Sequence, residues 1–365
     1  MKFSIIFGTR PEIIKLALVI KELCHSKHVV DIVFTGQHYD YIMSEEFIKE
    51  LDLPEPDFRL NCSHGSHAEQ TSSLLIAIER YLKKAEPDIL IAQGDTNTTL
   101  AGALAASKLN IPIAHIEAGC RSFDMKMPEE INRCIVDVVS SLLFAPTEKC
   151  VLNLLREGVG KDGIDMVGST LWEVCREYYS NPSLKSSILN KLGLKPKGYA
   201  LLTTHRQENV DTKENLENIV EALRMVKIEI VFPVHPRTAK RLKEFGLLPM
   251  LESASNVILS EPLGYLDFLT LLSQAQIVMT DSGGVQEESA LFHVPCATLL
   301  KATPWWETVE QGTNILVGAN KDEIADTVNR ILSDKDIYTH MSHVEVFKPM
   351  NSSELIVRRL GEFHS

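Results

Sequence analysis

Two carboxylates in the first half of the chain come directly after apolar runs of the kind that form buried strands. Asp95 comes shortly after the run 89–92, and Glu117 comes immediately after the run 111–116. Because parallel strands present their carboxyl ends at one edge of a sheet, we expect both side chains to face the same edge. Converging carboxylates can act as general acids or bases once burial and mutual repulsion raise a pKa. The pattern therefore indicates proton-transfer chemistry.

A further acidic pair stands at the start of a predicted helix. Glu129 and Glu130 follow Pro128, and Arg133 comes one turn later. Acidic side chains in a first helical turn are often only partners of the helix dipole, which is the expected role of one of the two. These residues alone leave open which of them has that role.

Two histidines of the second half come at the ends of apolar runs. His205 follows the run 199–204, and His235 follows the run 228–234. A single histidine at a strand end is more often structural than catalytic. Two of them, together with carboxylates and an anion site, favour a functional role.

The first anion-binding signal follows the apolar run 2–7. Gly8 permits a tight turn, and the helix that begins near Pro11 offers free N–H groups to an anion. Arg10 stands at the mouth of that helix, and Lys15 lies about one turn further on. The segment is not G-x-G-x-x-G, so a dinucleotide is not indicated. A plain turn with a solvated arginine is the alternative interpretation.

The second anion-binding signal is stronger and lies in the segment Ser282-Gly283-Gly284, after the run 277–280. The two glycines let the backbone approach a ligand closely, and Ser282 can cap the helix or donate a hydrogen bond. This arrangement suits a diphosphate at the helix N-terminus. Glu288 lies one turn deeper, where a carboxylate can accept both hydroxyls of a ribose. The alternative is a glycine-rich turn that serves packing only.

The hydrophobic pattern supplies the elements that must position these residues. Short apolar runs alternate with longer helical patterns, which predicts parallel strands covered on both faces. The predicted strands are 2–7, 29–34, 89–92, 111–116, 142–145, 199–204, 228–234, 257–259, 277–280 and 295–299, and the predicted helices include 68–84, 96–108, 213–226 and 352–363. A less regular stretch, 165–198, separates the two series. We expect an α/β fold of two Rossmann-like, doubly wound domains with the active site in the cleft between them.

The length and the net charge of the chain limit the classes of function that it can have. The chain has 365 residues, 37 basic and 49 acidic, and a net charge of −12. The length suggests about two domains, and the acidic balance argues against a nucleic-acid partner. A small phosphate ligand stays compatible, because a few local cations and helix ends suffice. The first apolar run is too short for a signal peptide, and no stretch approaches the roughly 20 apolar residues of a spanning helix. A cytoplasmic protein with no membrane partner is expected.

The cysteines and two further histidines give no sign of a metal site. The seven cysteines are odd in number, widely spaced and without a C-x-x-C pair, so reduced and mostly buried thiols are expected. His64 and His67 have a metal-like spacing but lack a third ligand nearby. Ser66 between them is predicted to be a helix N-cap, with Glu69 completing a capping box.

Taken together, the motifs resemble those of the non-hydrolysing UDP-N-acetylglucosamine 2-epimerases over nearly the whole chain. They are FGTRPEIIK at 7–15, GDTNTTLAGALAA at 94–106, HIEAGCRS at 115–122, MPEEINR at 127–133, THRQEN at 204–209, PVHPR at 233–237 and DSGGVQEE at 281–288. The resemblance implies a GT-B-type fold and a cytoplasmic homodimer that makes UDP-N-acetylmannosamine for surface polysaccharides. In this family, UDP is eliminated across C1–C2 to give 2-acetamidoglucal, UDP adds back, and C2 is reprotonated from the other face. Neither NAD nor a metal takes part.

The resemblance also implies roles for the motif residues. The catalytic candidates are Asp95, Glu117 and Glu129 as acids or bases, without assignment of faces, and His205, which steadies the departing diphosphate with Arg10 and Lys15. The other substrate-binding candidates are Arg133, His235, Pro262, Phe268, Ser282, Gly283, Gly284 and Glu288, where Pro262 and Phe268 flank the uracil and Glu288 holds the ribose. Bacterial members bind a second UDP-N-acetylglucosamine as activator, and Gln37, His38, Arg206 and His235 match parts of that site.

One departure from the family pattern bears on the substrate. The segment KATPWWE at 301–307 stands where many members have T-E-R-P-E, and Trp305 is closer to relatives that act on UDP-2,3-diacetamido uronic acids. The same chemistry on such a uronate is therefore the second hypothesis. A GT-B glycosyltransferase and a non-catalytic sensor of nucleotide sugars are the others. Asp40 stands where bacterial activator sites have a longer polar residue, which leaves allosteric activation open.

The expected domain organisation follows from the two series of strands. Residues 1–168 are assigned to an N-terminal Rossmann-like domain with the acid and base residues. Residues 169–350 are assigned to a C-terminal domain that binds UDP. Residues 351–365 form a final helix that is expected to pack back on the N-terminal domain.

Overall fold

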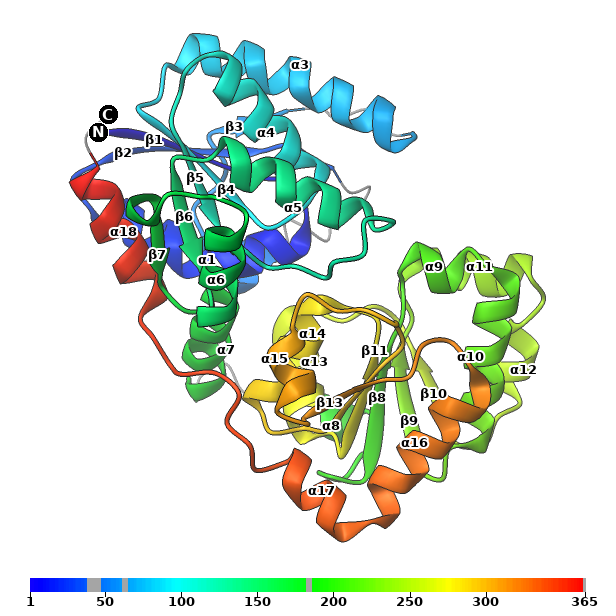
Figure 1. The fold of residues 1–365 in the computed structure, drawn as a ribbon. Helices are drawn as coiled ribbons and strands as arrows, with labels where there is room; N and C mark the ends of the chain where they lie inside the picture. Colours follow the sequence, from blue (N-terminus) through cyan, green and yellow to red (C-terminus); the bar gives the residue numbers. More distant parts are fainter. Residues whose placement is uncertain (38–46, 61–64, 182–185, 364–365) are drawn as a thin grey trace. The chain divides into compact units, whose positions relative to one another are not determined.

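The structure is a computed structural model that describes residues 1–37, 47–60, 65–181 and 186–363. The chain forms two compact units, one of Met1–Arg176 with Lys348–Ser365 and one of Glu177–Phe347 (Figure 1). The sequence placed these divisions after residues 168 and 350. The last helix, α18 (Ser352–Glu362), belongs to the first unit and packs there against α1 (Arg10–His25).

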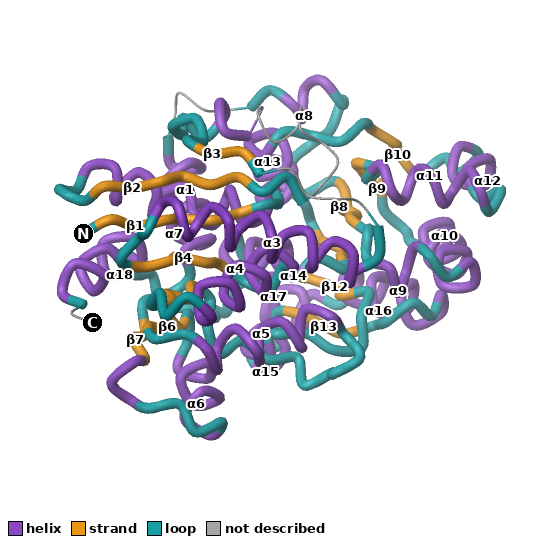
Figure 2. The backbone as a smooth tube through the Cα atoms, turned by 90° about the horizontal axis from the view of Figure 1, so that it is seen from above, coloured by secondary structure: helices purple, strands orange, loops and turns teal. Residues whose placement is uncertain are grey.

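The first unit is built on a seven-stranded parallel sheet in the order β3-β2-β1-β4-β5-β6-β7. Its strands are β1 (Lys2–Phe7), β2 (Val29–Phe34), β3 (Phe58–Arg59), β4 (Ile89–Gln93), β5 (Ile113–Ile116), β6 (Leu142–Ala145) and β7 (Ile164–Met166). The strands β1, β4, β5 and β6 are almost wholly apolar and buried, as the sequence predicted for strands covered on both faces. Figure 2 shows β2, β1 and β4 running side by side.

Helices cover both faces of this sheet. Figure 1 shows α3 (His67–Ala85), α4 (Asn97–Lys108) and α5 (Pro128–Val139) over one face, and α1 with α18 on the other. The remaining helices of the unit are α6 (Glu148–Arg156) and most of α7 (Thr170–Ser180), with a short 3-10 turn at Lys161–Gly163. Helix α3 begins as predicted, because Ser66 and Glu69 form the expected capping box.

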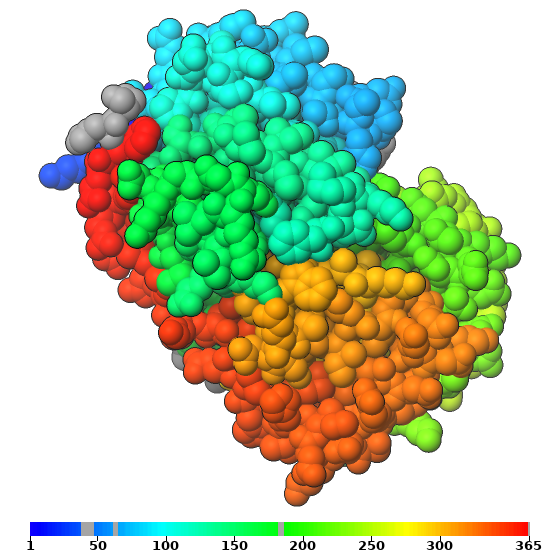
Figure 3. Space-filling view, in the orientation of Figure 1, coloured from blue at the N-terminus to red at the C-terminus, as the bar shows by residue number. Residues whose placement is uncertain are grey.

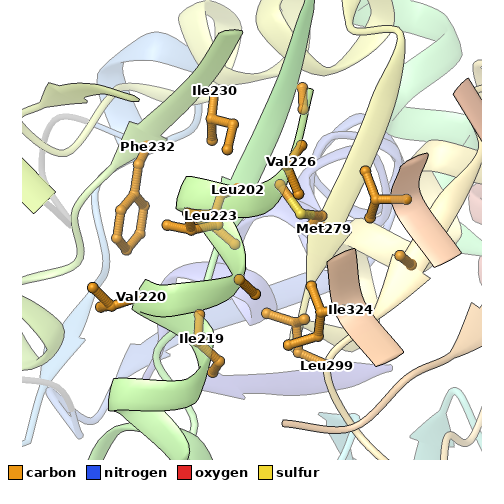
Figure 4. Close-up of a cluster of buried hydrophobic side chains, with 14 of the residues drawn as sticks. Leu202, Ile219, Val220, Leu223, Val226, Ile230, Phe232, Met279, Leu299 and Ile324 are labelled. Atoms are coloured by element: carbon orange, nitrogen blue, oxygen red, sulfur yellow. The ribbon is translucent and has the colours of Figure 1, made fainter. Parts of the chain in front are cut away.

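The second unit repeats the plan with a six-stranded parallel sheet in the order β10-β9-β8-β11-β12-β13. Its strands are β8 (Tyr199–Thr203), β9 (Glu229–Pro233), β10 (Val257–Ser260), β11 (Ile277–Thr280), β12 (Cys296–Thr298) and β13 (Asn314–Leu316). The core on one side of this sheet packs Leu202, Phe232 and Met279 against Leu223 of α10 (Lys213–Met225) and Ile324 of α16 (Lys321–Ser333) (Figure 4).

The helices of the second unit alternate with its strands. They are α8 (Ile188–Lys191), α9 (Gln207–Val210), α10 (Lys213–Met225), α11 (Pro236–Glu244), α12 (Leu248–Glu252), α13 (Tyr265–Gln274), α14 (Gly283–Leu291), α15 (Trp306–Glu310), α16 (Lys321–Ser333) and α17 (Lys335–Met341). The stretch 165–198, which the sequence left irregular, contains α7 and α8. The apolar face of α7 contributes Leu171, Val174 and Cys175 to the buried residues.

Both sheets therefore have the Rossmann strand order, with a switch point where the order reverses. In the first sheet the switch lies between β1 and β4, and in the second it lies between β8 and β11. The segments that follow these strands begin at Gly8, Gly94, Thr204 and Asp281. Ligands of open α/β sheets bind outside the carboxyl ends of the strands at such points. The sequence motifs with chemical potential thus occupy the positions where this fold binds ligands.

Candidate active site

The turn after β1 is too tightly packed for any residue but glycine at position 8. A Cβ atom on Gly8 would lie 2.2 Å from Oγ1 of Thr35 and 2.4 Å from Oγ1 of Thr98. The turn leads directly into α1, whose first residue is Arg10. The Arg10 guanidinium carbon lies 5.4 Å from the centre of the Phe47 ring. The Phe47 ring thus holds the Arg10 cation at the N-terminus of α1, where the backbone N–H groups also favour an anion.

Glu12, which the sequence analysis did not single out, holds this turn in place. Its buried carboxylate accepts hydrogen bonds from the backbone N–H groups of Gly8 (3.0 Å) and Thr9 (2.8 Å). It also accepts bonds from the hydroxyls of Thr96 (2.7 Å) and Thr99 (3.1 Å), which lie at the start of α4. Burial raises the pKa of Glu12, and these donors offset part of the effect. One carboxylate therefore joins the segments that follow β1 and β4.

Glu117 lies against two partners from neighbouring elements of the first unit. Its carboxylate forms an ion pair with Lys15 of α1 and accepts a hydrogen bond of 2.7 Å from Nε2 of Gln93, the last residue of β4. Glu117 also has a φ of +72°, an uncommon backbone conformation for a residue with a side chain. Lys15 and Glu117, which were expected to have separate roles, are thus in direct contact.

Asp95 is paired with a buried cation. Its carboxylate contacts the guanidinium of Arg133, which is almost fully buried and also donates to Glu130 at 2.8 Å. The backbone carbonyl of Asp95 accepts a bond of 2.8 Å from Nδ2 of Asn132. Arg133, an expected substrate ligand, therefore has contacts within the protein that fix Asp95 relative to α5.

The structure separates the two neighbouring acids at the start of α5. Glu130 is buried, and its carboxylate accepts bonds from the N–H groups of Ser122 (2.9 Å) and Phe123 (2.8 Å) in addition to the contact with Arg133. Glu129 is partly exposed. Glu130 thus has a structural role in shaping the preceding loop, and Glu129 is the one of the pair that is accessible for chemistry.

In the second unit, Asp281 organises the loop that carries His205. This fully buried carboxylate accepts hydrogen bonds from the N–H groups of His205 and Arg206 (3.1 Å each) and from Nδ2 of Asn209 (3.0 Å). It also accepts a bond of 2.7 Å from the hydroxyl of Thr204, and one of its oxygens lies 3.4 Å from Nδ1 of His205. With Nδ1 facing Asp281, Nε2 on the opposite side of the ring is directed away from this carboxylate.

His205 and His235 lie side by side but have different hydrogen-bonding environments. Their ring centres are 5.3 Å apart. Nδ1 of His235 accepts a hydrogen bond of 3.2 Å from the backbone N–H of Arg237, so His235 caps α11 as a neutral ring with its proton on Nε2. The pair therefore combines one histidine whose Nδ1 faces a carboxylate with one whose Nδ1 accepts a backbone hydrogen bond.

The glycine-rich segment begins a helix, as predicted. Helix α14 starts at Gly283 with Ser282 at the N-cap, and its first N–H groups point out of the helix end. Glu288, on the second turn, is buried. An added Cβ on Gly283 would touch the indole of Trp305 at 3.6 Å, in ordinary contact. Trp305 itself is 1% exposed and packs edge-on against Phe347 at 5.9 Å.

The remaining candidates differ in accessibility. Phe268 is partly buried against the core of the second unit, and Pro262 is partly exposed in the segment that precedes α13. Oε1 of Gln37 accepts bonds of 2.8 Å from the N–H and the hydroxyl of Thr98. Arg206 is partly exposed at the N-cap of α9. His38, the other candidate for an activator site, lies outside the described residues, as does His64.

Sequence reasoning missed three residues that hold the candidates in place, namely Glu12, Gln93 and Asp281. Gln93 ends β4 and Asp281 directly follows β11, whereas Glu12 lies in the first turn of α1. A polar residue that ends an otherwise apolar strand, such as Gln93 after 89–92, is a signal that could have been used. Glu12 and Asp281 lie within motifs that were quoted for other residues.

Comparison with known proteins places this geometry in a family. A family model described as UDP-N-acetylglucosamine 2-epimerase matches residues 21–361. The chain belongs to the UDP-N-acetylglucosamine 2-epimerase family. A curated member of this family, the UDP-N-acetylglucosamine 2-epimerase of Methanocaldococcus jannaschii, is 49% identical over 342 residues, which cover 92% of this chain and 93% of that protein.

Solved structures of the epimerase family share the fold. A crystal structure of the M. jannaschii enzyme in complex with UDP-GlcNAc and UDP matches with a TM-score of 0.92 and 47% identity, covering 100% of both chains. The GT-B-type fold expected from the sequence is thereby confirmed. Because the members of this family are isomerases, the alternative that this chain is a glycosyltransferase is not supported.

One relative in the epimerase family has a different named substrate. The UDP-2,3-diacetamido-2,3-dideoxy-D-glucuronate 2-epimerase of Pseudomonas aeruginosa is 42% identical over 337 residues, which cover 91% of this chain and 92% of that protein.

In the described part of the chain, no helix is both long and apolar enough to cross a membrane.

Proposed function

We propose that this protein interconverts UDP-N-acetylglucosamine and UDP-N-acetylmannosamine by eliminating UDP and adding it back. The observation that carries the proposal is the pair of cation-bound carboxylates, Asp95 with Arg133 and Glu117 with Lys15, which follow neighbouring strands β4 and β5 in a member of the epimerase family. The similarity to the M. jannaschii enzyme, whose crystals contain UDP-GlcNAc and UDP, supports the choice of substrate.

Inversion at C2 needs proton transfer on two faces of the sugar. In the first step a carboxylate removes the C2 proton, the C1–O bond breaks, and UDP departs to leave 2-acetamidoglucal. In the second step a phosphate oxygen of UDP adds at C1 and a carboxylic acid gives a proton to the other face of C2. Arg133 lies beside Asp95 and Lys15 lies beside Glu117, so each of these carboxylates is held in place by a cation. Glu129 supplies a third carboxyl group, and we assign no faces among the three.

The departing diphosphate needs positive charge and hydrogen-bond donors. In the first unit these are Arg10 and the N-terminus of α1, whereas Lys15 acts through its ion pair with Glu117. In the second unit they are His205, whose Nδ1 faces Asp281, and the N-terminus of α14 with Ser282, Gly283 and Gly284. Glu288 would hold the ribose, and Pro262 and Phe268 would flank the uracil. Each unit thus supplies part of the chemistry.

A uronate substrate is the second candidate, because the P. aeruginosa relative is named for one. The sequence feature that suggested it, Trp305, is almost fully buried and packs edge-on against Phe347. This contact and this burial therefore explain Trp305 as a residue that packs the interior of the second unit. This weakens the argument for a uronate from Trp305.

The reaction can be tested by incubating the protein with UDP-N-acetylglucosamine in D2O and following C2 by NMR. We expect UDP-N-acetylmannosamine to appear and deuterium to accumulate at C2 of both sugars, because each return step takes its proton from solvent-exchanged carboxyl groups. Glu117→Gln, which removes one exchangeable acid, is the inactive control. If no deuterium enters C2 and no manno product forms, the proposal is wrong. Activity only on UDP-2,3-diacetamido uronates would support the second candidate, and free N-acetylmannosamine with UDP would indicate a hydrolysing enzyme.

We further propose a cytoplasmic homodimer that supplies activated N-acetylmannosamine for surface polysaccharides. The location is supported by the six described cysteines, which are all thiols, as is usual in reducing compartments. The dimer is supported by an apolar stripe on α5 formed by Ile131, Ile135 and Val138, whose spacing of four and three residues places them on one helix face. Val138 is 73% exposed and Ile131 is 40% exposed. Gln37, Arg206 and His235 remain the candidates for an activator site.

A further inference from the structure

A buried ionic network lies beneath the loops that carry Asp95 and Glu117. Its centre is Asp137, near the end of α5, which is fully buried. Asp137 Oδ1 lies 2.6 Å from Nδ1 of His115 on β5, and Asp137 Oδ2 lies 2.6 Å from a guanidinium nitrogen of Arg121. The proposed reaction gives none of these three residues a role.

Both ring nitrogens of His115 face acceptors. Nε2 lies 2.8 Å from the carbonyl oxygen of Gly94, which can only accept a hydrogen bond, and Nδ1 faces the carboxylate of Asp137. Burial raises the pKa of Asp137, but His115 and Arg121 outweigh this effect and hold the pKa below its usual value. His115 therefore connects Asp137 to the residue immediately before Asp95.

The other half of the network holds the segment after Glu117. Asp137 Oδ2 accepts a bond of 3.0 Å from the N–H of Gly119, and Arg121 donates to the carbonyl oxygen of Cys120 at 2.8 Å. Gly119 has a φ of +79°, and a Cβ atom there would lie 2.3 Å from the carbonyl oxygen of Cys150. This segment is thus fixed at consecutive residues just past Glu117.

The Asp137 carboxylate therefore holds the backbone just before Asp95, through His115, and the backbone just after Glu117, through Gly119. The φ of +72° at Glu117 is maintained by such surroundings, since an isolated residue rarely adopts it. We propose that Asp137, through His115 and Arg121, is a positioning residue that fixes the separation of the Asp95 and Glu117 carboxylates for proton transfer at C2. This inference rests on the proposed function, because it concerns the same two carboxylates.

The network offers a matched control at its outer end. Arg121 also forms two bonds with Glu157, at 2.8 and 2.6 Å, and the Glu157 side chain is 34% exposed. Glu157→Gln removes an ion pair from the same guanidinium and leaves Asp137 with its partners. The Glu157→Gln variant therefore distinguishes the effect of losing an ion pair with Arg121 from the effect of losing the positioning by Asp137.

The test compares Asp137→Asn with Glu157→Gln in the full-length protein. We expect Asp137→Asn to lower kcat by about 10- to 100-fold, because a small misplacement of reacting groups has effects of this size. KM for UDP-N-acetylglucosamine should change by less than about threefold, and the limbs of the kcat–pH profile should move, because Asp95 and Glu117 shift relative to Arg133 and Lys15. Glu157→Gln should change kcat by less than about twofold and leave the profile in place.

A second variant and a second measurement cover the case in which Asp137→Asn does not fold. Arg121→Lys keeps the buried charge but loses the planar fork, and we expect a smaller fall in kcat with the same movement of the pH profile. Hydrogen exchange should quicken at the amides of residues 94–96 and 117–121 in either folded variant and not in Glu157→Gln. Folded variants with kcat within about threefold of the parent and an unmoved profile would overturn the inference. A parent protein inactive on UDP-N-acetylglucosamine would instead refute the proposed function and, with it, the catalytic purpose of the network.

Discussion

Glu129 and Glu130 are neighbours at the start of α5, yet their surroundings give them different roles. Glu130 is buried and accepts hydrogen bonds from the segment Ser122-Phe123 as well as from Arg133. Glu129 is partly exposed on the adjacent position of the helix turn. Successive residues on a helix point about 100° apart, so one side chain enters the interior while the next stays accessible. The proposal that Glu129 transfers a proton depends on this difference.

Substituting each acid by its amide should separate stability from catalysis. Glu130→Gln leaves Arg133 without one of its buried carboxylates, and we expect the free energy of unfolding to fall by about 3 kcal/mol. Glu129→Gln should change the free energy of unfolding by less than about 0.5 kcal/mol and lower kcat by about 100-fold or more. Denaturant titration and steady-state kinetics of the two proteins measure this. Loss of activity in Glu130→Gln at full stability, with Glu129→Gln unaffected, would assign the roles the other way round.

At the scale of elements, single carboxylates join the segments that follow the strands. Glu12 joins the turn after β1 to the start of α4, and Asp281 joins the end of β11 to the loop after β8. Asp211, at the end of α9, joins that helix to α11 through Arg237 and Arg241. Because His235 is the N-cap of α11, this last pairing helps to place the histidine beside His205.

The pairing of Asp211 predicts a pH dependence of stability. Partial burial raises the pKa of Asp211, but the two arginines outweigh it and the pKa lies below its usual value. A carboxyl group with a lowered folded-state pKa contributes stability above its unfolded pKa of about 3.9 and loses it as the pH falls. Asp211→Asn should therefore lower the free energy of unfolding by about 0.5–1 kcal/mol at pH 7, with a smaller effect at high salt.

The comparison for Asp211 is Asp326→Asn, which removes an exposed carboxylate from α16. Denaturant midpoints measured from pH 7 down to pH 3 should show the Asp211→Asn deficit shrinking toward zero, while Asp326→Asn follows the parent throughout. A deficit that stays constant over this range would show that the arginine contacts contribute nothing through charge.

At the scale of the whole molecule, the net charge of −12 coexists with the proposed site for an anionic substrate. In the proposed reaction, part of the acidic excess consists of the carboxylates that transfer protons or position other groups, and cations such as Arg10 act locally. Apolar surface is the second large-scale feature. Segments around residues 120–140, teal to green in Figure 3, lie at the surface, and α5 contributes the stripe of Ile131, Ile135 and Val138.

This stripe predicts the effect of a charge on assembly. Val138→Glu places a carboxylate on the stripe, and we expect it to shift the protein from dimer to monomer, because burying an unpaired charge in an interface is unfavourable. Met225→Glu, at a 42% exposed position of the second unit, should leave the dimer intact. Sedimentation velocity over a range of concentrations measures both. A parent protein that is monomeric, or a Val138→Glu protein that dimerises as tightly as the parent, would contradict the proposed interface.

The fold could be predicted from the sequence to within about two residues at most strand ends. The strands 2–7, 29–34, 142–145 and 277–280 have the predicted bounds, because continuous apolar runs are a local signal. The strands β3, β7 and β13 were not predicted. They are two or three residues long and lie at or near sheet edges, where burial is incomplete and the apolar signal is weak.

The sequence by itself determined the residue types at the strand ends, the alternation of strands and helices, and the family. The tertiary structure decided which of these residues touch. Lys15 and Glu117 are 102 positions apart, and Thr204 and Asp281 are 77 positions apart. Such pairs depend on strand order and helix docking, which no local pattern encodes. For the same reason the sequence could not separate Glu129 from Glu130 or find the buried centre at Asp137, since burial of a single side chain is a property of the packed molecule.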